Sequence, residues 1–506
     1  MGHPSNSPEQ THRKARIVAV IAATAIALSC GTNYAFSAWE PEFAERMELS
    51  ATQANLIGNF GNIGMYAMGI PGGILIDKKG PRWGVLVGVV GLAVGYFGLH
   101  AAYQGGAGSM GVPLLCFFSL STGIASCTAF SAALKVSATN WPRHRGTATA
   151  FPLSAFGLSA FFYTTLSAAV FPNDTAGYLL LLAIVATGMV FVGMLFLRMI
   201  PPSSPYDALP SDERPGLARK DSNRLRRTSA HGRQTDDETA SLVSSDSGPG
   251  DLEDNKPYLD QHAHQKPEIT GWVLLKTPTF WKLFVMLGLL CGVGLMTINN
   301  IGNNARSLWH HYDDSASHEF IQQRQVMHVG IISIFSFLGR LSSGIGSDWL
   351  IHHGASRFWT LVASASIFTV AQMLGLRIED PNYLFWLSGL TGLGYGALFG
   401  VYPALVADAF GPTGMGINWG AMTWAPVLSG NFFNLAYGGI LDQHSVIKEG
   451  QAGHHPERVC DEGLSCYASA YWITLIASVV GVVWALYCIR HEKAERMREE
   501  PREHEG

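Results

Sequence analysis

Charged side chains are scarce in this sequence. Lys, Arg, Asp and Glu make up 14% of the 506 residues, against roughly 25% in soluble proteins. Hydrophobic residues reach 48%, and the mean hydropathy is +0.17. Many apolar runs contain 18 or more residues, which is enough to cross about 30 Å of hydrocarbon. The sequence therefore argues against a large soluble protein and predicts an all-α membrane protein that crosses the bilayer many times.

Signals for catalysis, metals and nucleic acid are also missing. Three pairs of histidines are adjacent in sequence, at 310–311, 352–353 and 454–455. Adjacent side chains do not face one another on a helix, so these pairs do not indicate a metal site. Gly392, Gly394 and Gly396 imitate a dinucleotide-binding spacing, but no strand precedes them, so we expect helix packing there. A net charge of −4 gives no indication of nucleic-acid binding. We expect no enzyme, no cofactor, no metal and, because residues 1–16 are polar and basic, no cleavable signal peptide.

Seven cysteines are present, and five of them fall in apolar runs, where they pack as small hydrophobic residues. Cys460 and Cys466 instead flank a polar loop. They are candidates for a small disulfide if that loop faces an oxidising compartment, and two free thiols are the alternative.

The apolar runs predict twelve membrane spans in two groups of six. The first six are 17–38, 53–76, 83–102, 110–136, 147–170 and 177–199, and the last six are 279–301, 325–349, 357–377, 382–407, 414–440 and 468–489. The stretch between the groups is rich in Ser, Asp, Arg and Pro and predicts a disordered linker. The domains are therefore a tail (1–16), a six-helix bundle (17–200), a linker (201–270), a second bundle (271–490) and a tail (491–506).

Lys and Arg in the short loops predict the orientation. They gather on one side of the predicted spans, at Arg13, Lys14, Arg16, Lys78, Lys79, Arg82, Arg143, Arg145, Arg357, Arg490, Lys493 and Arg496. The loop after the first span, on the other side, carries Glu40, Glu42, Glu45 and Glu48. By the positive-inside rule, both termini and the linker are cytosolic.

A glycine-rich hinge that ends in mixed charges joins the second and third spans. Its key positions are Gly73, Asp77, Lys78, Gly80 and Arg82. A weaker copy lies in the second half at Gly339, Arg340, Gly344, Gly346 and Asp348. Glycines let helices approach closely, and we expect Asp77 to pair with Lys78 and Arg82 and hold the cytosolic side closed. The repeat indicates a chain built twice.

Six spans, a cytosolic linker, six further spans and this repeated hinge resemble the major facilitator superfamily. The stretches at 30–37 and 58–64, with Trp141, Pro142 and Arg143, are similar to its nodulin-like branch. That branch resembles fungal monocarboxylate-porter homologues of the vacuolar membrane. The resemblance implies two six-helix bundles around a central cavity, with a small-molecule substrate and the lipid bilayer as partners.

Polar residues in the second span share one helix face. Asn55, Asn59, Asn62 and Tyr66 recur at helical spacing. Because unpaired amides are costly in lipid, this face should look into the bundle or a wet cavity. The alternative is hydrogen bonding that only holds helices together.

By the resemblance, the first and seventh spans line the cavity from opposite sides. On that ground the substrate-binding candidates are Asn33, Tyr34, Asn299, Asn300 and Asn303. Asn59 and Asn62 join them from the polar face of the second span. Tyr402 and Trp424 join them as aromatic residues of the tenth and eleventh spans, suited to closing a pocket or stacking on a cationic solute. Amides and phenols orient a polar solute without fixing its charge. Gating contacts, helix packing or an interfacial aromatic belt are the alternatives for these residues.

Ionisable residues are nearly absent from the spans. His328 is the candidate for proton coupling, since histidine titrates near neutral pH, and a hydrogen-bonded structural histidine is the alternative. No mid-span arginine is an obvious carboxylate ligand, and we expect Arg306 at the membrane interface. A monocarboxylate, an amino acid, a polyol or an organic cation all remain candidate solutes.

The linker carries two short regulatory patterns. Residues 226–229 fit a site for a basophilic kinase, and 238–243 resemble a sorting signal for an adaptor, which favours the vacuolar over the plasma membrane. The sequence thus predicts a secondary transporter for a small polar solute, with protons as a candidate coupling ion and alternating access as the mechanism. The alternative is a nutrient receptor that does not transport and signals through its linker.

Overall fold

The computed structural model describes residues 12–141, 145–200, 269, 271–313, 315–411, 415–448 and 457–503. In this part of the chain, ten helical segments are long and apolar enough to cross a membrane. The second and eleventh predicted spans are each present as two shorter helices in succession. Together they give the twelve spans of the predicted all-α membrane fold, and the fold class is confirmed.

The first six spans follow the predicted order. They comprise α1 (Arg13–Cys30) with the 3-10 helix η1 (Thr32–Ala38), α3 (Ala51–Ala67) with α4 (Gly69–Lys79), α5 (Pro81–Gly105), α6 (Val112–Asn140), α7 (Arg145–Val170), and α8 (Thr175–Leu181) with the π-helix η2 (Leu182–Ala186) and α9 (Thr187–Phe196). The short helix α2 (Glu40–Arg46) joins the first and second spans.

The second six spans form the other half. They comprise α11 (Pro278–Tyr312), α12 (His318–His352), α13 (Phe358–Gly375), the 3-10 turn η3 (Pro381–Tyr383) with α14 (Leu384–Phe410), α15 (Met415–Met422) with α16 (Trp424–His444), and α17 (Ala468–Glu503). The short helix α10 (Trp272–Lys276) precedes them, and the 3-10 turn η4 (Gly463–Cys466) precedes α17.

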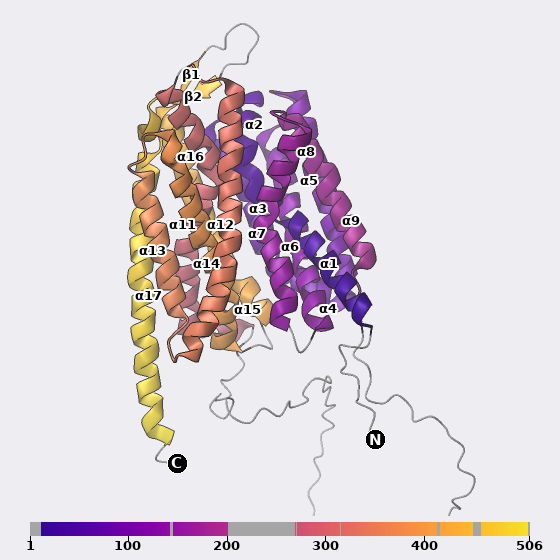
Figure 1. Ribbon diagram of the computed structural model, residues 1–506, viewed down its shortest axis with the longest axis vertical. Helices are drawn as coiled ribbons and strands as arrows, with labels where there is room; N and C mark the ends of the chain where they lie inside the picture. The colour runs from indigo at the N-terminus through magenta and orange to yellow at the C-terminus, as the bar shows by residue number, and fades with distance from the viewer. Residues whose placement is uncertain are drawn as a thin grey trace, which may run out of the picture. The chain divides into compact units, whose positions relative to one another are not determined.

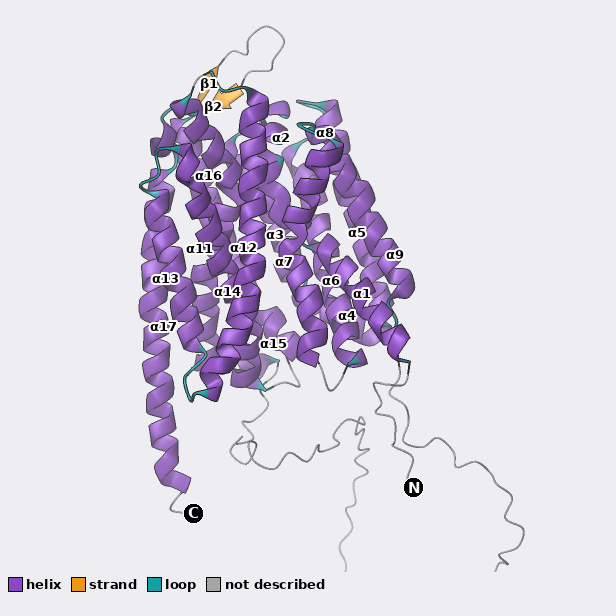
Figure 2. Cartoon of the chain, in the orientation of Figure 1, coloured by secondary structure: helices purple, strands orange, loops and turns teal. Residues whose placement is uncertain are grey.

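The spans run side by side between two ends (Figure 1). We call the end at which α1 begins and α17 finishes the terminal end. At the opposite end lie α2 and an antiparallel hairpin of β1 (Val446–Lys448) and β2 (Glu457–Val459), with Val446 paired to Val459 (Figure 2). Cys460 and Cys466 follow the hairpin and form a disulfide with an S–S distance of 2.01 Å.

Glycines set the packing of the second span against the fourth in each half. A Cβ atom at Gly123 of α6 would lie 2.0 Å from the carbonyl oxygen of Gly61 in α3. In the second half, a Cβ atom at Gly396 of α14 would lie 2.1 Å from the Ser336 carbonyl oxygen in α12. The two backbones can approach this closely only without side chains. Helix packing at Gly396 is as predicted.

The hinge after the second span is built by its glycine and proline. Gly80 ends α4 with φ 91°, a conformation that favours glycine, and Pro81 opens α5 where its missing N–H costs nothing. Asp77 pairs with Lys135 of α6 at 2.5 Å, rather than with Lys78 or Arg82 as predicted. The pair joins two helices of one half, and the side chains are 68% and 37% exposed, so it contributes about 1 kcal/mol at most.

The second half repeats this arrangement with one extra charge. Arg357, just before α13, lies between Asp348 of α12 at 2.7 Å and Asp408 of α14 at 2.8 Å. The end of the second span is thus tied to the end of the fourth in both halves. Arg340 belongs to the predicted hinge copy, but it takes no part in this ion pair.

Replacing Gly123 by alanine should destabilise the protein. The added methyl group meets backbone that cannot move aside, and overpacking of this kind costs about 1–3 kcal/mol. Gly188→Ala is the control, because a Cβ atom at Gly188 meets nothing within 4 Å. Thermal unfolding of the two purified variants should show a lower Tm for Gly123→Ala alone, and an equal Tm would contradict this packing.

Candidate functional site

A buried arginine lies where the two halves meet. Arg340 is 7% exposed and sits about 18 Å before the end of α12, by the helical rise of about 1.5 Å per residue. Its Nη1 donates to the carbonyl oxygen of Leu153 in α7 at 3.3 Å. Its Nε and Nη2 are buried and have no hydrogen-bond partner. One side of a guanidinium fork is therefore unsatisfied inside the protein.

Aromatic rings from both halves face this guanidinium. The ring of Phe156 in α7 lies 5.4 Å from it, and the ring of Phe399 in α14 lies 5.8 Å from it. Gly157 makes room, because a Cβ atom there would lie 3.3 Å from Arg340 Nε. Cation–π contacts with desolvated rings contribute about 2 kcal/mol. They favour the charge but leave its hydrogen-bonding capacity unused.

The electrostatics of Arg340 favour an anion. The effective cost of burying an ion is several kcal/mol even after relaxation. Among the described residues no carboxylate pairs with Arg340. The planar fork of arginine matches a carboxylate in bidentate fashion, with two charge-assisted hydrogen bonds. The arrangement is suited to binding a small anion supplied from outside the chain.

Three tyrosine hydroxyls extend this site. Tyr66 and Tyr395 lie 2.6 Å apart at their oxygens, and Tyr34 lies 3.4 Å from Tyr395. The Tyr34 ring packs edge-on against Phe156 at 5.5 Å, and Tyr395 packs against Phe399 at 4.9 Å. We call Tyr34, Tyr66, Phe156, Arg340, Tyr395 and Phe399 the central cluster. Its members come from α3, α7 and η1 of one half and from α12 and α14 of the other.

Four buried asparagines form a second connection between the halves. Asn55 donates to Asn300 at 2.8 Å, Asn300 donates to Asn434 at 3.1 Å, and Asn434 donates to Asn59 at 2.9 Å. We call these residues the amide chain. It runs from α3 through α11 and α16 and back to α3. Asn59 and Asn300, two predicted substrate ligands, are thus engaged in interhelical hydrogen bonds.

The other predicted amides lie at different levels. Asn33 donates to the Gly61 carbonyl oxygen at 3.3 Å within the first half. Asn62 and Asn299 are buried, and the Nδ2 atom of each lacks a partner. Asn303 lies at the opposite end, where it donates to Glu40.

Three further predicted residues are not part of the central cluster. Tyr402 donates to the Leu283 carbonyl oxygen inside the second half, and Trp424 is 43% exposed on the outside of α16. His328 is 1% exposed and hydrogen-bonds to Ser388 of α14 at 3.1 Å, also within one half. Helical spacing located their helices but not the faces that the neighbouring helices cover. Tyr402 and Trp424 are therefore not members of the central cluster, and their role as ligands stays a prediction.

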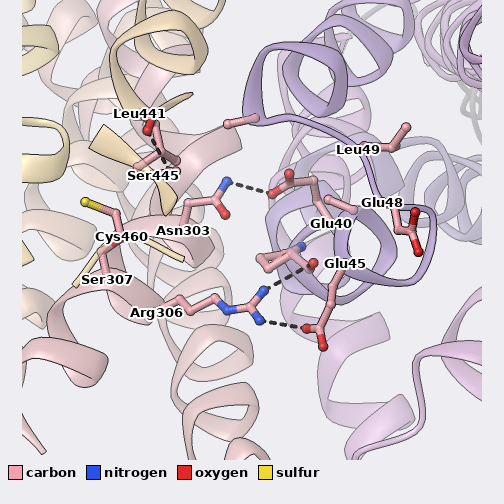
Figure 3. A pocket seen from close by; sticks show the side chains of 13 residues that line it. Glu40, Glu45, Glu48, Leu49, Asn303, Arg306, Ser307, Leu441, Ser445 and Cys460 are labelled. Carbon is pink, nitrogen blue, oxygen red and sulfur yellow. Dashed lines mark hydrogen bonds and ion pairs between the residues drawn. The ribbon is translucent and has the colours of Figure 1, made fainter. Parts of the chain in front are cut away.

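Acidic residues of α2 meet α11 at the opposite end. Asn303 donates to Glu40 at 2.8 Å, and Arg306 pairs with Glu45 at 2.6 Å (Figure 3). These residues line a cavity of about 190 Å³ that Leu441 and Ser445 of the second half also border. Arg306 faces these carboxyls from the other half, so the contacts tie the halves together there.

The two carboxyls have pKa values shifted in opposite directions. Burial raises the pKa of Glu40 to about 8, although the hydrogen bond from Asn303 opposes the change. Burial alone would raise the pKa of Glu45 as well. The hydrogen bond from His318 and the charge of Arg306 outweigh burial and lower the pKa of Glu45 to about 2. One carboxyl therefore favours its protonated form while its neighbour stays ionised.

The sequence patterns did not indicate that Arg340, Glu40 and Glu42 are buried. The glycine pattern places Arg340 in the hinge copy, although its position inside the predicted span 325–349 marks it as a buried charge. Glu40 and Glu42 contribute only to the predicted orientation of the chain in the membrane, although both residues closely follow the first span. In both cases, the position of a charged residue within or beside a predicted span could have indicated that it is buried.

Twelve spans in two six-helix halves, with a polar cluster between them, define the fold of a membrane transporter. The chain belongs to the Major Facilitator Superfamily, whose sequence profile matches residues 21–430. The profile match confirms the resemblance to this superfamily that the two groups of six spans and the repeated hinge indicated.

The relatives and structures similar to this chain agree with that assignment. An uncharacterised membrane protein of Saccharomyces cerevisiae is 25% identical, with 96% of each chain covered. A probable transporter, MCH1, of Gibberella zeae is 27% identical, with 93% of this chain and 89% of that protein covered. Among solved structures, a D-xylose–proton symporter has a TM-score of 0.58 at 14% identity, with 93% of this chain and 96% of that chain covered.

Removing one link of the amide chain should loosen the contact between the halves. Asn434→Ala leaves Asn59 and Asn300 with unmet hydrogen bonds, at a cost of about 1–3 kcal/mol. Asn431→Ala is the matched control, because its Nδ2 donates only to the Val427 carbonyl oxygen of its own helix. Thermal unfolding should show a clearly lower Tm for Asn434→Ala, and equal losses in both variants would contradict the role of the chain.

Proposed function

We propose that this protein is a secondary transporter that carries a small organic anion, such as a monocarboxylate, across a membrane by alternating access. The observation that carries the proposal is Arg340, a buried cation between the halves whose Nε and Nη2 nitrogens have no hydrogen-bond partner. In this proposal the carboxylate of the solute binds Nε and Nη2. The aromatic rings of the central cluster cover the apolar part of the solute.

The construction of the central cluster supports alternating access. Its members come from both halves, so rocking of the halves about the cluster would open it to one side and then to the other. In the structure the halves touch toward both ends. A Cβ atom at Gly302 of α11 would lie 2.2 Å from the Ser37 carbonyl oxygen near the opposite end, and one at Gly69 of α4 would lie 3.0 Å from Gly420 Cα near the terminal end. We interpret the arrangement as a closed intermediate of the cycle.

The similar proteins support transport of a small solute. One relative is named a probable transporter, and the structural neighbours include a nucleoside transporter and a proton symporter for D-xylose. The choice of an anion comes from Arg340 alone. The receptor alternative depends on the linker 201–270, which lies outside the described residues except for Ile269.

We further propose that the terminal end faces the cytosol and that the protein resides in the vacuolar membrane. The first part is supported by the Lys and Arg residues at that end, which include Lys78, Lys79 and Arg82. The second part is supported by the resemblance to fungal vacuolar homologues. The kinase site at 226–229 and the sorting pattern at 238–243 lie outside the described residues.

A carboxylate should stabilise the purified protein, and its neutral analogue should not. A suitable pair of test compounds is lactate and lactamide, which have similar shapes and differ in charge. A ligand that binds the folded state raises the Tm by mass action, so a panel of such pairs identifies the charge that the site requires. Equal stabilisation by acid and amide would contradict the proposal.

Arg340→Gln should abolish this response and the transport of the same solute in proteoliposomes. Loss of charge-assisted hydrogen bonds worth about 2 kcal/mol weakens binding about 30-fold. Arg340→Lys keeps the charge but not the fork, and we expect partial loss. Arg324→Gln in the same helix is the control, since Arg324 packs on Trp309 and Phe320 away from the central cluster. Full transport by Arg340→Gln would refute the anion site.

A further inference from the structure

Two buried carboxyls outside the membrane spans have no role in the anion site. Glu40 is 3% exposed and Glu42 is 6% exposed, both in the first turn of α2. Glu40 accepts a hydrogen bond from Asn303 of the other half, whereas Oε2 of Glu42 is buried without a partner. A buried carboxylate with an unpaired oxygen is costly, and protonation is the usual way to remove that cost.

The nearby positive charges offset the burial of this pair only in part. Arg306 of α11 is already bound to Glu45, and His318 of α12 also lies 3.5 Å from Glu45. The groups that face the pair are Glu45 of α2, Tyr103 of α5, Arg306 of α11, His318 of α12 and Tyr437 of α16. Asp442 of α16 is directed elsewhere, to the backbone N–H groups of Ala51 and Thr52.

We propose that Glu40 and Glu42 form a proton-binding site that controls closure of the opposite end. The halves close there when a proton enters the buried pair, and they separate when the pair releases it to water. The proton, supplied by the compartment at that end, is the ligand of the site. This inference rests on alternating access in the proposed function and names the ion that regulates it.

Geometry explains how one proton can act on the whole end. The hydrogen bond between Asn303 and Glu40 and the ion pair between Arg306 and Glu45 both cross from α11 to α2 (Figure 3). Near them, a Cβ atom at Gly302 of α11 would lie 2.2 Å from the Ser37 carbonyl oxygen, so the backbones touch. Separation of α2 from α11 would admit water to the carboxyls. Closure would remove that water, so closure and proton uptake are linked.

The sign of the pH dependence follows from this linkage. Burial holds the pKa of Glu40 at about 8 in the closed form, and water in the open form returns it toward about 4.3. The closed form is therefore fully favoured below about pH 4.3 and loses that advantage as the pH rises toward 8. Between these values one linked proton changes the ratio of closed to open molecules by up to about tenfold per pH unit.

Spin labels across the opposite end can measure this ratio. The sites are Ala107→Cys, between α5 and α6, and Glu379→Cys, between α13 and α14, and both positions are exposed. The five free native cysteines of the described chain are buried, which protects them from the label. Double electron–electron resonance on the full chain, without solute, should show the short-distance population falling as the pH rises from 5.5 to 8.5.

Variants of the two carboxyls test the assignment. Glu40→Gln imitates the protonated acid and should weaken the pH dependence. The double variant Glu40→Gln with Glu42→Gln should remove it in a labelled chain that also carries His318→Gln, because the ion pair of His318 with Glu45 depends on pH as well. Glu48→Gln, an exposed neighbour in the same acidic segment, should keep the full response. The proposal would be overturned if the distances in the labelled chain that keeps both glutamates did not change with pH. It would also be overturned if the double variant responded to pH as strongly as that chain does.

The anion site can fail without affecting this result. Arg340→Gln in the same labelled chain should keep the pH-dependent distances while losing any effect of the solute. If solute binding survives Arg340→Gln, the anion proposal is wrong and the proton site stands on its own measurements. If the pH response is absent while Arg340→Gln still abolishes transport, only the proton site is wrong.

Discussion

The uncompensated charge of Arg340 is the constraint on which this account depends. Arg340 is held between two six-helix halves, its Nε and Nη2 nitrogens lack partners, and no carboxylate in the described part of the chain pairs with it. It therefore keeps an electrostatic cost that packing alone does not remove. Phe156 and Phe399 lower that cost from opposite halves, so the halves must meet for the charge to be tolerated. An anion that completes the fork would stabilise the same meeting. Solute binding and contact between the halves are therefore linked through one side chain.

The remaining polar contacts differ with their position along the membrane spans: some join the two halves and others join helices of one half. The amide chain joins the halves within the spans, and the acidic residues of α2 join them at the opposite end. Pairs near the terminal end, such as Asp77 with Lys135, instead hold helices of one half together. A rocking motion can thus preserve each half as a unit while it breaks the few contacts that cross between them. The carboxyls of α2 add a dependence on protons at the end where water enters.

Much of the fold follows from the sequence, because apolar runs of spanning length can only be helices in lipid. The twelve spans and the glycine-rich hinge could be predicted from residue pattern alone. Side-chain partners could not, since they depend on which faces the neighbouring helices cover. Asp77 binds Lys135, which lies 58 residues away in sequence, and Tyr402 turns into its own half. Arg340 was visible as a charge within a span, but its missing partner is a property of the three-dimensional structure.

Direct observation of a bound solute tests the central claim most sharply. A cryo-electron microscopy map of the protein with a brominated monocarboxylate would locate the anion relative to Arg340. The account predicts carboxylate density within hydrogen-bonding distance, about 2.7–2.9 Å, of both Nε and Nη2, with the rest of the solute against the rings of the central cluster. A carboxylate bound elsewhere while Arg340 remains without an anion would contradict it.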